Sequence, residues 1–450
     1  MAILHSPRSC WSAMHLQLRV SILLAPLLLG SCGFVDWLGG KRPKQTFCEQ
    51  HPDNQECQQE YPDADARCKS NADCMTPTGV CDLAGERMCV QCIAPTQMSA
   101  CTGTTPACAL EKMCVQCVAP DQTSACTGTT PTCAPDHTCQ PCRKHQDCVA
   151  SHACLADGSC AQVDQVAYVD PLLGGGATCT LTAPCKRIAD ALTTSRPILK
   201  LTGMIDEQIQ IERNATLLAD PGTKLTSTTN GIIVEVRGSS QVTISDLTIA
   251  GASGPAGSGL GISLPPGSTA SLTLSRVVIF GNQGGGISIS GGQFDITNCV
   301  IAGNGSAQTS FGGVRFDQID NGRRRFEFNT VADNVAKDGT SVGVVCTLVT
   351  QPLTFSNNIV YGNQIGGTRT QVGGANCNWV YSDIGPDTLS GTGNINTDPL
   401  FTNPSQNDFH IQPTSPVKGK ADPGATVRID IDGETRPQGG GYDMGADEIQ

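Results

Sequence analysis

The chain has 450 residues, including 50 glycines and 25 cysteines, and 4% of its residues are aromatic. This composition is typical of a turn-rich β protein of two or three domains, and charged residues, at 16%, are too few for a disordered chain. The formal net charge of −12 argues against nucleic acid as a partner.

Residues 1–31 have the features of an export signal. Arg19 precedes an apolar run over residues 20–29, which has the length of a signal-peptide core and is too short to span a bilayer. Residues 29–32, Leu-Gly-Ser-Cys, resemble the lipobox of bacterial lipoproteins, in which the cysteine, here Cys32, carries the lipid. The resemblance implies a lipid anchor that holds the protein in the outer membrane or at the cell surface. The alternative is an ordinary cleaved signal in which Cys32 is coincidental.

Residues 32–67 are expected to form the lipidated N-terminus and a linker, with a disulfide between Cys48 and Cys57. From residue 68 to residue 160, sixteen cysteines fall into four units of four, and two residues separate the last cysteine of each unit from the first cysteine of the next. The units are Cys68, Cys74, Cys81 and Cys89; Cys92, Cys101, Cys108 and Cys114; Cys117, Cys126, Cys133 and Cys139; and Cys142, Cys148, Cys154 and Cys160.

Each cysteine unit is too small and too polar to bury a core, so cross-links are expected to replace one. Disulfides are favoured because the segment follows an export signal. The alternative is zinc, because the junctions Cys89-x-x-Cys92 and Cys114-x-x-Cys117 are spaced like zinc ligands. Connectivity does not follow from spacing, and first-to-third with second-to-fourth is the pairing we expect.

Beyond residue 165, five glycines open short strands at steps of 25 to 30 residues. They are Gly231, Gly261, Gly286, Gly313 and Gly343. Apolar residues stand one and three positions after each glycine, which predicts stacked β-coils. The positions two and four after each glycine then face outward; they are Ile233, Ser263, Ser288, Arg315 and Val345, and Glu235, Pro265, Ser290, Asp317 and Thr347.

Each coil has two further apolar strands. The second has inward pairs Val242/Ile244, Leu272/Leu274, Phe294/Ile296, Phe326/Phe328 and Leu353/Phe355, and the third has Ile249, Ile279, Ile301, Val331 and Val360. Three residues after the third strand's apolar residue comes a column of Asn282, Asn304, Asn334 and Asn363, interrupted at Ala252. Stacked asparagines can hydrogen-bond from coil to coil, so this column is expected to be structural.

Residues 165–395 therefore resemble right-handed parallel β-helix proteins of the pectate-lyase-like superfamily. The expected fold class is all-β: a right-handed parallel β-helix solenoid, preceded by a small disulfide-rich repeat region and a lipoprotein signal peptide.

Both ends of such a solenoid need covers. At the entrance, Ile188, Ala191 and Leu192 share one helical face, which predicts a capping helix, and a Cys179–Cys185 disulfide is expected to close the loop before it. At the exit, motifs in residues 396–450 resemble the terminal domain of surface proteins called choice-of-anchor Q. This region is expected to be a C-terminal cap. The motifs occupy residues 397–401, 408–411, 430–436 and 443–448.

Three cysteines remain in the solenoid. Cys346 and Cys377 each stand three residues after a glycine, so if Gly374 opens a sixth coil they occupy the same slot on neighbouring strands and can form a disulfide. Cys299 stands where earlier coils have Leu247 and Val277, and is expected to be a buried free thiol.

The outward positions offer little catalytic chemistry. Pectate-lyase-like enzymes use a carboxylate cradle for calcium on this face, whereas here the acids are one per distant coil, so calcium is only a possible cofactor and no other is expected. The densest charge cluster comprises Arg315, Asp317, Asp320, Arg323, Arg324 and Arg325. We interpret it as a solvated loop between strands or, alternatively, as a contact for acidic glycans, because arginine suits carboxylate and sulfate.

In the C-terminal region, Asp430 and Asp432 resemble part of a calcium loop, but a tight turn at Asp432-Gly433 with Arg436 paired to a nearby acid is favoured. His410 is expected to be structural. The preferred hypothesis is an outer-membrane lipoprotein with a non-catalytic β-helix that binds glycan or matrix. The alternatives are a polysaccharide lyase or glycoside hydrolase, and a purely structural spacer.

Overall fold

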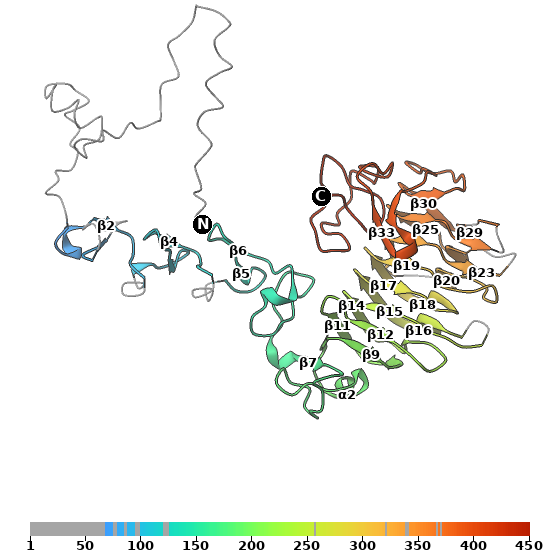
Figure 1. The fold of residues 1–450 in the computed structure, drawn as a ribbon, viewed down its shortest axis with the longest axis horizontal. Helices are drawn as coiled ribbons and strands as arrows, with labels where there is room; N and C mark the ends of the chain where they lie inside the picture. Colours follow the sequence, from blue (N-terminus) through green and yellow to red (C-terminus); the bar gives the residue numbers. More distant parts are fainter. Residues whose placement is uncertain are drawn as a thin grey trace, which may run out of the picture. The chain divides into compact units, whose positions relative to one another are not determined.

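The computed structural model describes residues 68–450 except 75–78, 85–87, 95–99, 120–125, 256–257, 320–321, 338–341, 366–367 and 370 (Figure 1). The chain divides into two compact units, Met1–Val90 and Gln91–Gln450. The signal peptide, Cys32, Cys48 and Cys57 lie outside the described residues, as does Asp320. Within the described part, no helix is long and apolar enough to cross a membrane.

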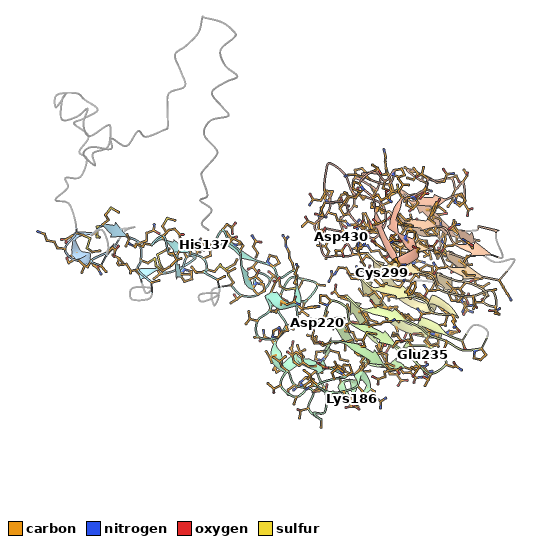
Figure 2. All side chains as sticks on the ribbon, in the orientation of Figure 1. His137, Lys186, Asp220, Glu235, Cys299 and Asp430 are labelled. Atoms are coloured by element: carbon orange, nitrogen blue, oxygen red, sulfur yellow. A yellow bond between two sulfur atoms is a disulfide. The ribbon has the colours of Figure 1, made fainter. Side chains whose placement is uncertain are left out.

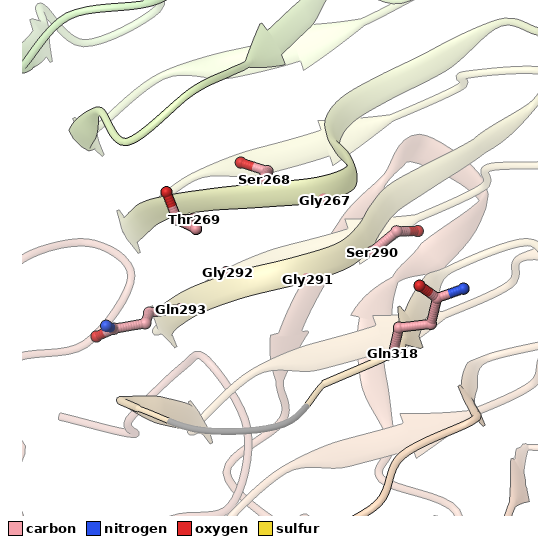
Figure 3. A pocket seen from close by; sticks show the side chains of 8 residues that line it. All are labelled: Gly267, Ser268, Thr269, Ser290, Gly291, Gly292, Gln293 and Gln318. Atoms are coloured by element: carbon pink, nitrogen blue, oxygen red, sulfur yellow. The ribbon is translucent and has the colours of Figure 1, made fainter.

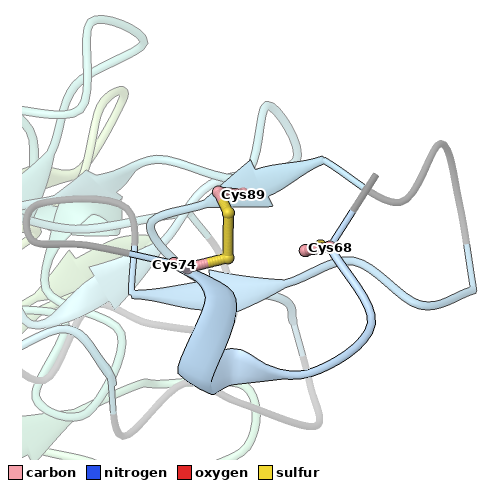
Figure 4. A group of neighbouring side chains, drawn as sticks. All are labelled: Cys68, Cys74 and Cys89. Carbon is pink, nitrogen blue, oxygen red and sulfur yellow. A yellow bond between two sulfur atoms is a disulfide. The ribbon is translucent and has the colours of Figure 1, made fainter. Parts of the chain in front are cut away.

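The described part of the first unit is one cysteine repeat. A 3-10 turn, η1 (Asn71–Asp73), precedes a hairpin of β1 (Val80–Cys81) and β2 (Cys89–Val90). Disulfides join Cys68 to Cys81 and Cys74 to Cys89; Figure 4 shows the second bond beside Cys68. Each strand of the hairpin is thus joined by a disulfide to a cysteine that precedes the hairpin.

The second unit begins with three more repeats of this kind. Two contain hairpins, formed by β3 (Ala107–Cys108) with β4 (Cys114–Val115) and by β5 (Thr132–Cys133) with β6 (Cys139–Gln140). The third contains the 3-10 turn η3 (His145–Asp147) and a bridge between Cys154 and Cys160. The disulfides are Cys92–Cys108, Cys101–Cys114, Cys117–Cys133, Cys126–Cys139, Cys142–Cys154 and Cys148–Cys160.

In all four repeats the first cysteine therefore pairs with the third and the second with the fourth. Sulfur atoms that cluster within 4.8 Å of one another belong to these disulfides, so they are not thiolate ligands for zinc. The junctions have a hydrogen-bonding role as well: the side chains of Gln91 and Gln116 accept bonds from the backbone N–H of Cys114 and Cys139, at 2.7 and 3.0 Å.

From residue 166 the chain winds into parallel coils whose strands form three rows (Figure 1). Row 1 contains β10 (Ile209–Ile211), β13 (Val234–Val236), the first halves of β16 (Leu260–Ser275) and β18 (Gly285–Thr297), β20 (Val314–Asp317), β24 (Val344–Thr347) and β29 (Val372–Gly374). Row 2 contains β7 (Val166–Val169), β8 (Ile198–Leu201), β11 (Ala215–Ala219), β14 (Gln241–Ser245), the second halves of β16 and β18, β21 (Arg324–Glu327), β25 (Leu353–Ser356) and β30 (Cys377–Val380).

Row 3 is an eight-stranded sheet. Its strands are β9 (Met204–Asp206), β12 (Lys224–Thr226), β15 (Thr248–Ala250), β17 (Val278–Phe280), β19 (Val300–Ala302), β22 (Thr330–Ala332), β26 (Ile359–Tyr361) and β31 (Asp383–Gly385). A small sheet of β23 (Val335–Ala336), β27 (Gln364–Ile365) and β28 (Thr368–Arg369) lies outside the rows. The expected parallel solenoid is therefore confirmed.

The glycine period has a steric cause. Gly261, Gly286, Gly313 and Gly343 stand at one position of successive coils, directly before the first inward residue of row 1 in each coil. A Cβ atom at any of them would lie 2.3 to 2.7 Å from the carbonyl oxygen of the equivalent residue in the next coil. A side chain is excluded there because the coils stack too closely.

Two inward positions differ from the sequence prediction. In the first of the five coils, Val234 lies opposite Ile262, so the strand begins two residues later than Gly231 implies, and Ile233 is buried rather than outward. In the fourth, Phe326 lies opposite Ile296, so Phe328 is not an inward strand residue. Phe328 stands at the following turn with φ of 54° and is buried against the C-terminal region.

The core between the rows is apolar and, in its later coils, aromatic. Phe294 and Phe316 stack with ring centroids 4.5 Å apart, and Phe355 lies 5.1 Å from both Phe316 and Trp379. All four side chains are nearly or fully buried. Burial of such rings, at about 25 cal/mol per Å², is a main favourable term for these coils.

The asparagine column forms a ladder. Asn282, Asn304 and Asn334 each donate a side-chain N–H to the side-chain oxygen of the next asparagine in the column, at 2.8 to 3.0 Å. Asn363 continues the ladder by donating to the side-chain oxygen of Gln371. A second ladder, which the sequence analysis missed, runs from the backbone N–H of Cys299 through Asn329 and Asn358 to Ser382 at the turn between rows 2 and 3.

The Cys346–Cys377 disulfide is present, with its Cα atoms 6.3 Å apart, but the strand register that suggested it is wrong. Cys346 lies opposite Gly374 in row 1, whereas Cys377 lies opposite Leu353 in row 2. The last coil is short, so Cys377 reaches the second row where a longer coil would still be in the first. Cys299 is the free cysteine of the described residues; it is fully buried, and burial raises its pKa to about 12 (Figure 2).

At the entrance, helix α2 (Ile188–Thr193) buries Ile188 and Ala191 after the Cys179–Cys185 disulfide. The fourth cysteine repeat and η4 (Val163–Gln165) lead directly into β7. Apolar contacts join Ala153 of this repeat to outward residues of the first row 2 strands, and the hydroxyl of Tyr168 donates to the carbonyl of Ser151 at 2.8 Å. This repeat is therefore packed on the solenoid and is not an independent module.

The exit differs from the expected cap. The last coil is covered by the segment before residue 396, in which Ile395 pairs with Asp383 and Leu389 packs on the core. Residues 396–450, with β32 (Phe401–Asn403), η5 (Pro404–Gln406) and β33 (Asp408–Ile411), pack along row 3 instead: Phe409 contacts Ala302 and Ala332. The reason is that later row 3 strands such as β17 and β26 are apolar on their outward face too, so this part of the face needs burial.

We expect Asn334→Ala to lower the free energy of unfolding by roughly 2 to 6 kcal/mol, because it leaves the backbone N–H and side-chain amide of buried Asn304 without their acceptor. The matched control is Asn378→Ala, at an exposed outward position of β30. Denaturant unfolding should separate the two variants. Equal midpoints would mean that the ladder contributes nothing measurable to stability.

A second prediction concerns Asp383, a buried carboxyl whose Oδ1 accepts the N–H of Thr397 while Oδ2 has no hydrogen-bond partner. Burial raises its pKa to about 7. Because the pKa is higher in the folded state, Asp383 should make stability fall as pH rises from about 4 to about 7. Asp383→Asn should therefore raise the unfolding midpoint at pH 8 and not at pH 4, whereas Asp164→Asn, at an exposed carboxyl, should change neither. An equal effect of Asp383→Asn at both pH values would contradict this account.

Candidate functional site

The outward face of row 1 carries polar residues in two columns. The first runs through Gln210, Glu235, Ser263, Ser288, Arg315 and Val345, and the second through Ser290, Asp317 and Thr347. Ser263, Ser288 and Ser290 are buried although they point away from the core. Their hydroxyls are therefore recessed below the surface of the molecule.

Two buried polar atoms on this face, Nε of Arg315 and Oδ1 of Asp317, have no hydrogen-bond partner among the described residues. The rest of the Arg315 guanidinium is held in place: Nη2 donates to the Ser288 hydroxyl at 3.0 Å, and its Cζ lies 5.0 Å from the ring centroid of Phe311. Unpaired buried polar groups are rare in folded proteins and call for a partner.

A recess of about 370 Å³ lies beside the strand that carries these two atoms (Figure 3). Hydroxyls, amides and glycines line it: Gly267, Ser268, Thr269, Ser290, Gly291, Gly292, Gln293 and Gln318. Ser290 lies beside Asp317 on the neighbouring strand, and Gln318 follows Asp317 directly. Ser290 and Gln318 thus place the recess next to Asp317, although Asp317 and Arg315 are not among its lining residues.

An irregular strand pairing creates the recess. Between Leu264 and Ser271, β16 advances seven residues, while β18 advances four between their partners Ile289 and Gln293, so β16 carries three extra residues. Such bulges bend strands and place unpaired backbone beside them. The sequence signals are the glycines of Pro-Pro-Gly at 265–267 and Gly-Gly at 291–292, all three with positive φ. They lie outside the glycine period, which therefore did not predict the bulge.

The predicted charge cluster is divided between two rows. Arg315 and Asp317 lie on β20 of row 1, so Asp317 is a strand residue and not a loop charge. Arg324 and Arg325 lie on β21 of row 2, immediately after Arg323. Asp320 lies outside the described residues.

The row 2 arginines are already engaged in ion pairs. Arg323 pairs with Asp295, Nη1 of Arg325 lies 3.9 Å from Asp295, and Nη2 of Arg325 lies 2.6 Å from Oε2 of Glu327. Asp295 is buried beneath them. This group is therefore a compensated network, and Arg315 is the better candidate for ligand contact.

The carboxylates do not form a catalytic pair on row 1. Glu235 on β13 and Asp317 on β20 are three strand spacings apart, about 14 Å, which exceeds the separation of about 10 Å in glycoside hydrolases. Asp295 and Glu327 lie on neighbouring strands but both bind Arg325. On the described row 1 strands from β16 to β24, Asp317 is the one acid, too few oxygens for calcium.

In the C-terminal region, Asp430 shapes a turn. Its Oδ1 accepts the N–H groups of Asp432 and Glu434, Oδ2 accepts that of Glu448, and Gly433 has φ of 78°. Burial raises the pKa of Asp430 to about 6. Since both oxygens bind backbone, the structure favours the turn over the calcium loop.

Arg436 is buried close to Glu448, with Nη1 3.7 Å from Oε2, and its guanidinium stands over the ring of Phe328 at 4.4 Å. It thereby joins the C-terminal region to the solenoid turn that Phe328 occupies.

His410 is not isolated. Nδ1 lies 2.5 Å from Oδ1 of Asp408, and Nε2 lies 2.9 Å from Oδ2 of Asp432. The hydrogen bond to Asp432, followed by that to Asp408, raises the pKa of His410 to about 10 against the opposing effect of burial. Together with Asp447, His410 and Asp432 bring one ligand atom each within 4.8 Å of one another.

Comparison with known proteins identifies the solenoid. A model of the family described as "right handed beta helix region" matches residues 230–384. The fold is a right-handed parallel β-helix. Among solved structures, the chain is similar to one titled "Crystal structure of pectate lyase Pel9A", with a TM-score of 0.38 and 13% identity over 63% of this chain and 96% of that one. No curated protein matches.

Proposed function

We propose that this protein binds carbohydrate, without catalysis, on the row 1 face of its β-helix. The observation that carries the proposal is the pair of buried atoms without partners, Nε of Arg315 and Oδ1 of Asp317, on the strand next to the recess that Ser290 lines. A sugar presents hydroxyls that can donate to the free carboxylate oxygen and accept from the guanidinium. The ligand would thus replace the partners that the fold does not supply.

Acidic glycans are the favoured ligand class. Arg315 retains an Nε–H without a partner, and guanidinium groups bind carboxylate and sulfate strongly. Asp317 would contact the neutral hydroxyls of the same ligand, while Gln293 and Gln318 line the recess as exposed amides. The absence of a second free carboxylate on the described strands around the site is what favours binding over hydrolysis.

The proposal includes a location. A lipid on Cys32 would hold the protein in the outer membrane or at the cell surface, and the disulfide repeats would separate the β-helix from the lipid. The repeats suit an oxidising compartment, because their sixteen cysteines are all paired.

A polysaccharide lyase or glycoside hydrolase of the pectate-lyase-like kind is the second candidate. The unpaired Oδ1 of Asp317 favours it, because such atoms also occur at catalytic sites. The two functions differ in one measurable product: an enzyme releases reducing ends or unsaturated uronates from the glycan, and a binding protein does not.

We expect the purified protein to bind uronate-containing or sulfated oligosaccharides on a glycan array. Asp317→Asn and Arg315→Gln should each weaken the affinity by on the order of tenfold, since each removes a charged partner from the ligand's hydrogen bonds. Glu212→Gln, at an exposed position directly after β10 at the other end of row 1, is the matched control and should bind normally.

Unchanged binding by both site variants would place the ligand elsewhere, and no binding by the wild type would leave the spacer alternative. Glycan cleavage by the wild type that is lost in Asp317→Asn would establish the enzyme instead.

The anchor has its own test. Cells that express the full chain should incorporate a labelled fatty acid into the wild-type protein and not into Cys32→Ser, and only the wild type should sediment with membranes. Soluble wild-type protein without label would show that the signal is cleaved by an ordinary signal peptidase.

A further inference from the structure

The cluster around His410 lies outside the proposed glycan site and joins three segments of the C-terminal region. Asp408 and His410 lie on β33, Asp432 follows the turn at Asp430, and Asp447 lies near the end of the chain. Oδ2 of Asp447 accepts the N–H of Ile411 at 2.8 Å, which fixes this carboxylate beside the strand. The four side chains come together only because these segments are packed against each other.

The two ring nitrogens of His410 have different surroundings. Nδ1 is 2.5 Å from Asp408, two residues away on the same strand, and this carboxylate also accepts the backbone N–H of His410. Nε2 is 2.9 Å from Asp432, on the side of the ring where Asp447 also contributes to the cluster. A carboxylate on one ring nitrogen orients the ring and makes the other nitrogen a better ligand, as is common around histidines that bind metals.

From this geometry we propose that His410, Asp432 and Asp447 bind a divalent transition-metal ion of the zinc class, with Asp408 as a positioning residue. Three ligand atoms within 4.8 Å of one another fit one ion with bonds of about 2.0 to 2.2 Å. Solvent can reach the site, since about half of the His410 and Asp432 side-chain surface is exposed, so water can complete the coordination.

The ligand set selects the class of ion. An imidazole nitrogen suits zinc, cobalt or nickel, whereas calcium takes six to eight oxygens. Three carboxylates also surround one imidazole. Even with His410 positively charged, the cluster has an excess of negative charge that a dication would neutralise. The ion would tie β33 and the end of the chain to the Asp430 turn.

The test is zinc binding to the full, disulfide-bonded protein by isothermal titration calorimetry, with thermal unfolding as a second readout. Wild type should bind one additional Zn²⁺ relative to His410→Asn, and zinc should raise its unfolding midpoint. Calcium should do neither. In zinc-soaked crystals, anomalous scattering should give a peak bonded to Nε2 of His410.

Matched variants separate the ligands from other histidines. His410→Asn and Asp432→Asn should each weaken zinc binding by at least about 100-fold, and Asp408→Asn by about tenfold with the stoichiometry kept. His152→Asn, at an exposed histidine whose positive φ asparagine tolerates, should bind as wild type does.

Asp432→Asn lies in an exposed turn and tests the proposal if His410→Asn does not fold. Equal zinc binding by wild type and Asp432→Asn, or an anomalous peak only at other residues, would overturn the proposal; so would stronger binding of calcium than of zinc.

Discussion

The close stacking of coils is the constraint on which the rest of this structure depends. Successive parallel strands lie about 4.8 Å apart, and every turn that enters the interior carries backbone groups with no access to water. Asn334 shows how the turns meet this requirement, since its amide binds Asn304 in the coil before and Asn363 in the coil after. Each coil therefore completes the hydrogen bonds of its neighbour, and no coil in the ladder is satisfied alone.

The same stacking positions the functional chemistry. Because the ladder and the glycine column hold the register, Ser288 and Arg315, and likewise Ser290 and Asp317, lie side by side although some 27 residues separate them. A regular solenoid would make this face flat. The three extra residues of β16 break the regularity at one place and leave a recess beside the aligned polar groups. The site thus needs both the regular register and its local interruption.

The repeated part of the fold could be predicted from the sequence, and the predictions that were wrong have specific causes. The period locates four of the five coils, whereas after Gly231 the row 1 strand begins two residues later than it does after the other glycines. Phe328 continues the apolar alternation of β21, yet its partner is Arg436, more than a hundred residues away, which no local pattern reveals. The recess could not be predicted from the period because a bulge departs from it.

The sequence also contains a signal that row 3 is covered on its outward face. Residues 278–280, Val-Ile-Phe, and 359–361, Ile-Val-Tyr, are apolar on both faces, a pattern of strands that are covered on both sides. The C-terminal region supplies that cover through Phe409, and the fourth cysteine repeat covers the outward residues of the first row 2 strands, such as Tyr168. The later strands of row 2 carry the ion pairs of Asp295 with Arg323 and Arg325.

Row 1 differs from these surfaces in what lies beside its unpaired atoms. Buried polar atoms without partners also occur on rows 2 and 3, at Asp295 and Asp383, but those of Arg315 and Asp317 lie on the strand next to a recess. A protein that buried its other outward surfaces in this manner could have used apolar residues here at lower cost, because a buried polar group without a partner destabilises the folded state by about 1 to 3 kcal/mol. The unpaired atoms of Arg315 and Asp317 beside the recess are therefore the physical argument for the proposed binding on this face.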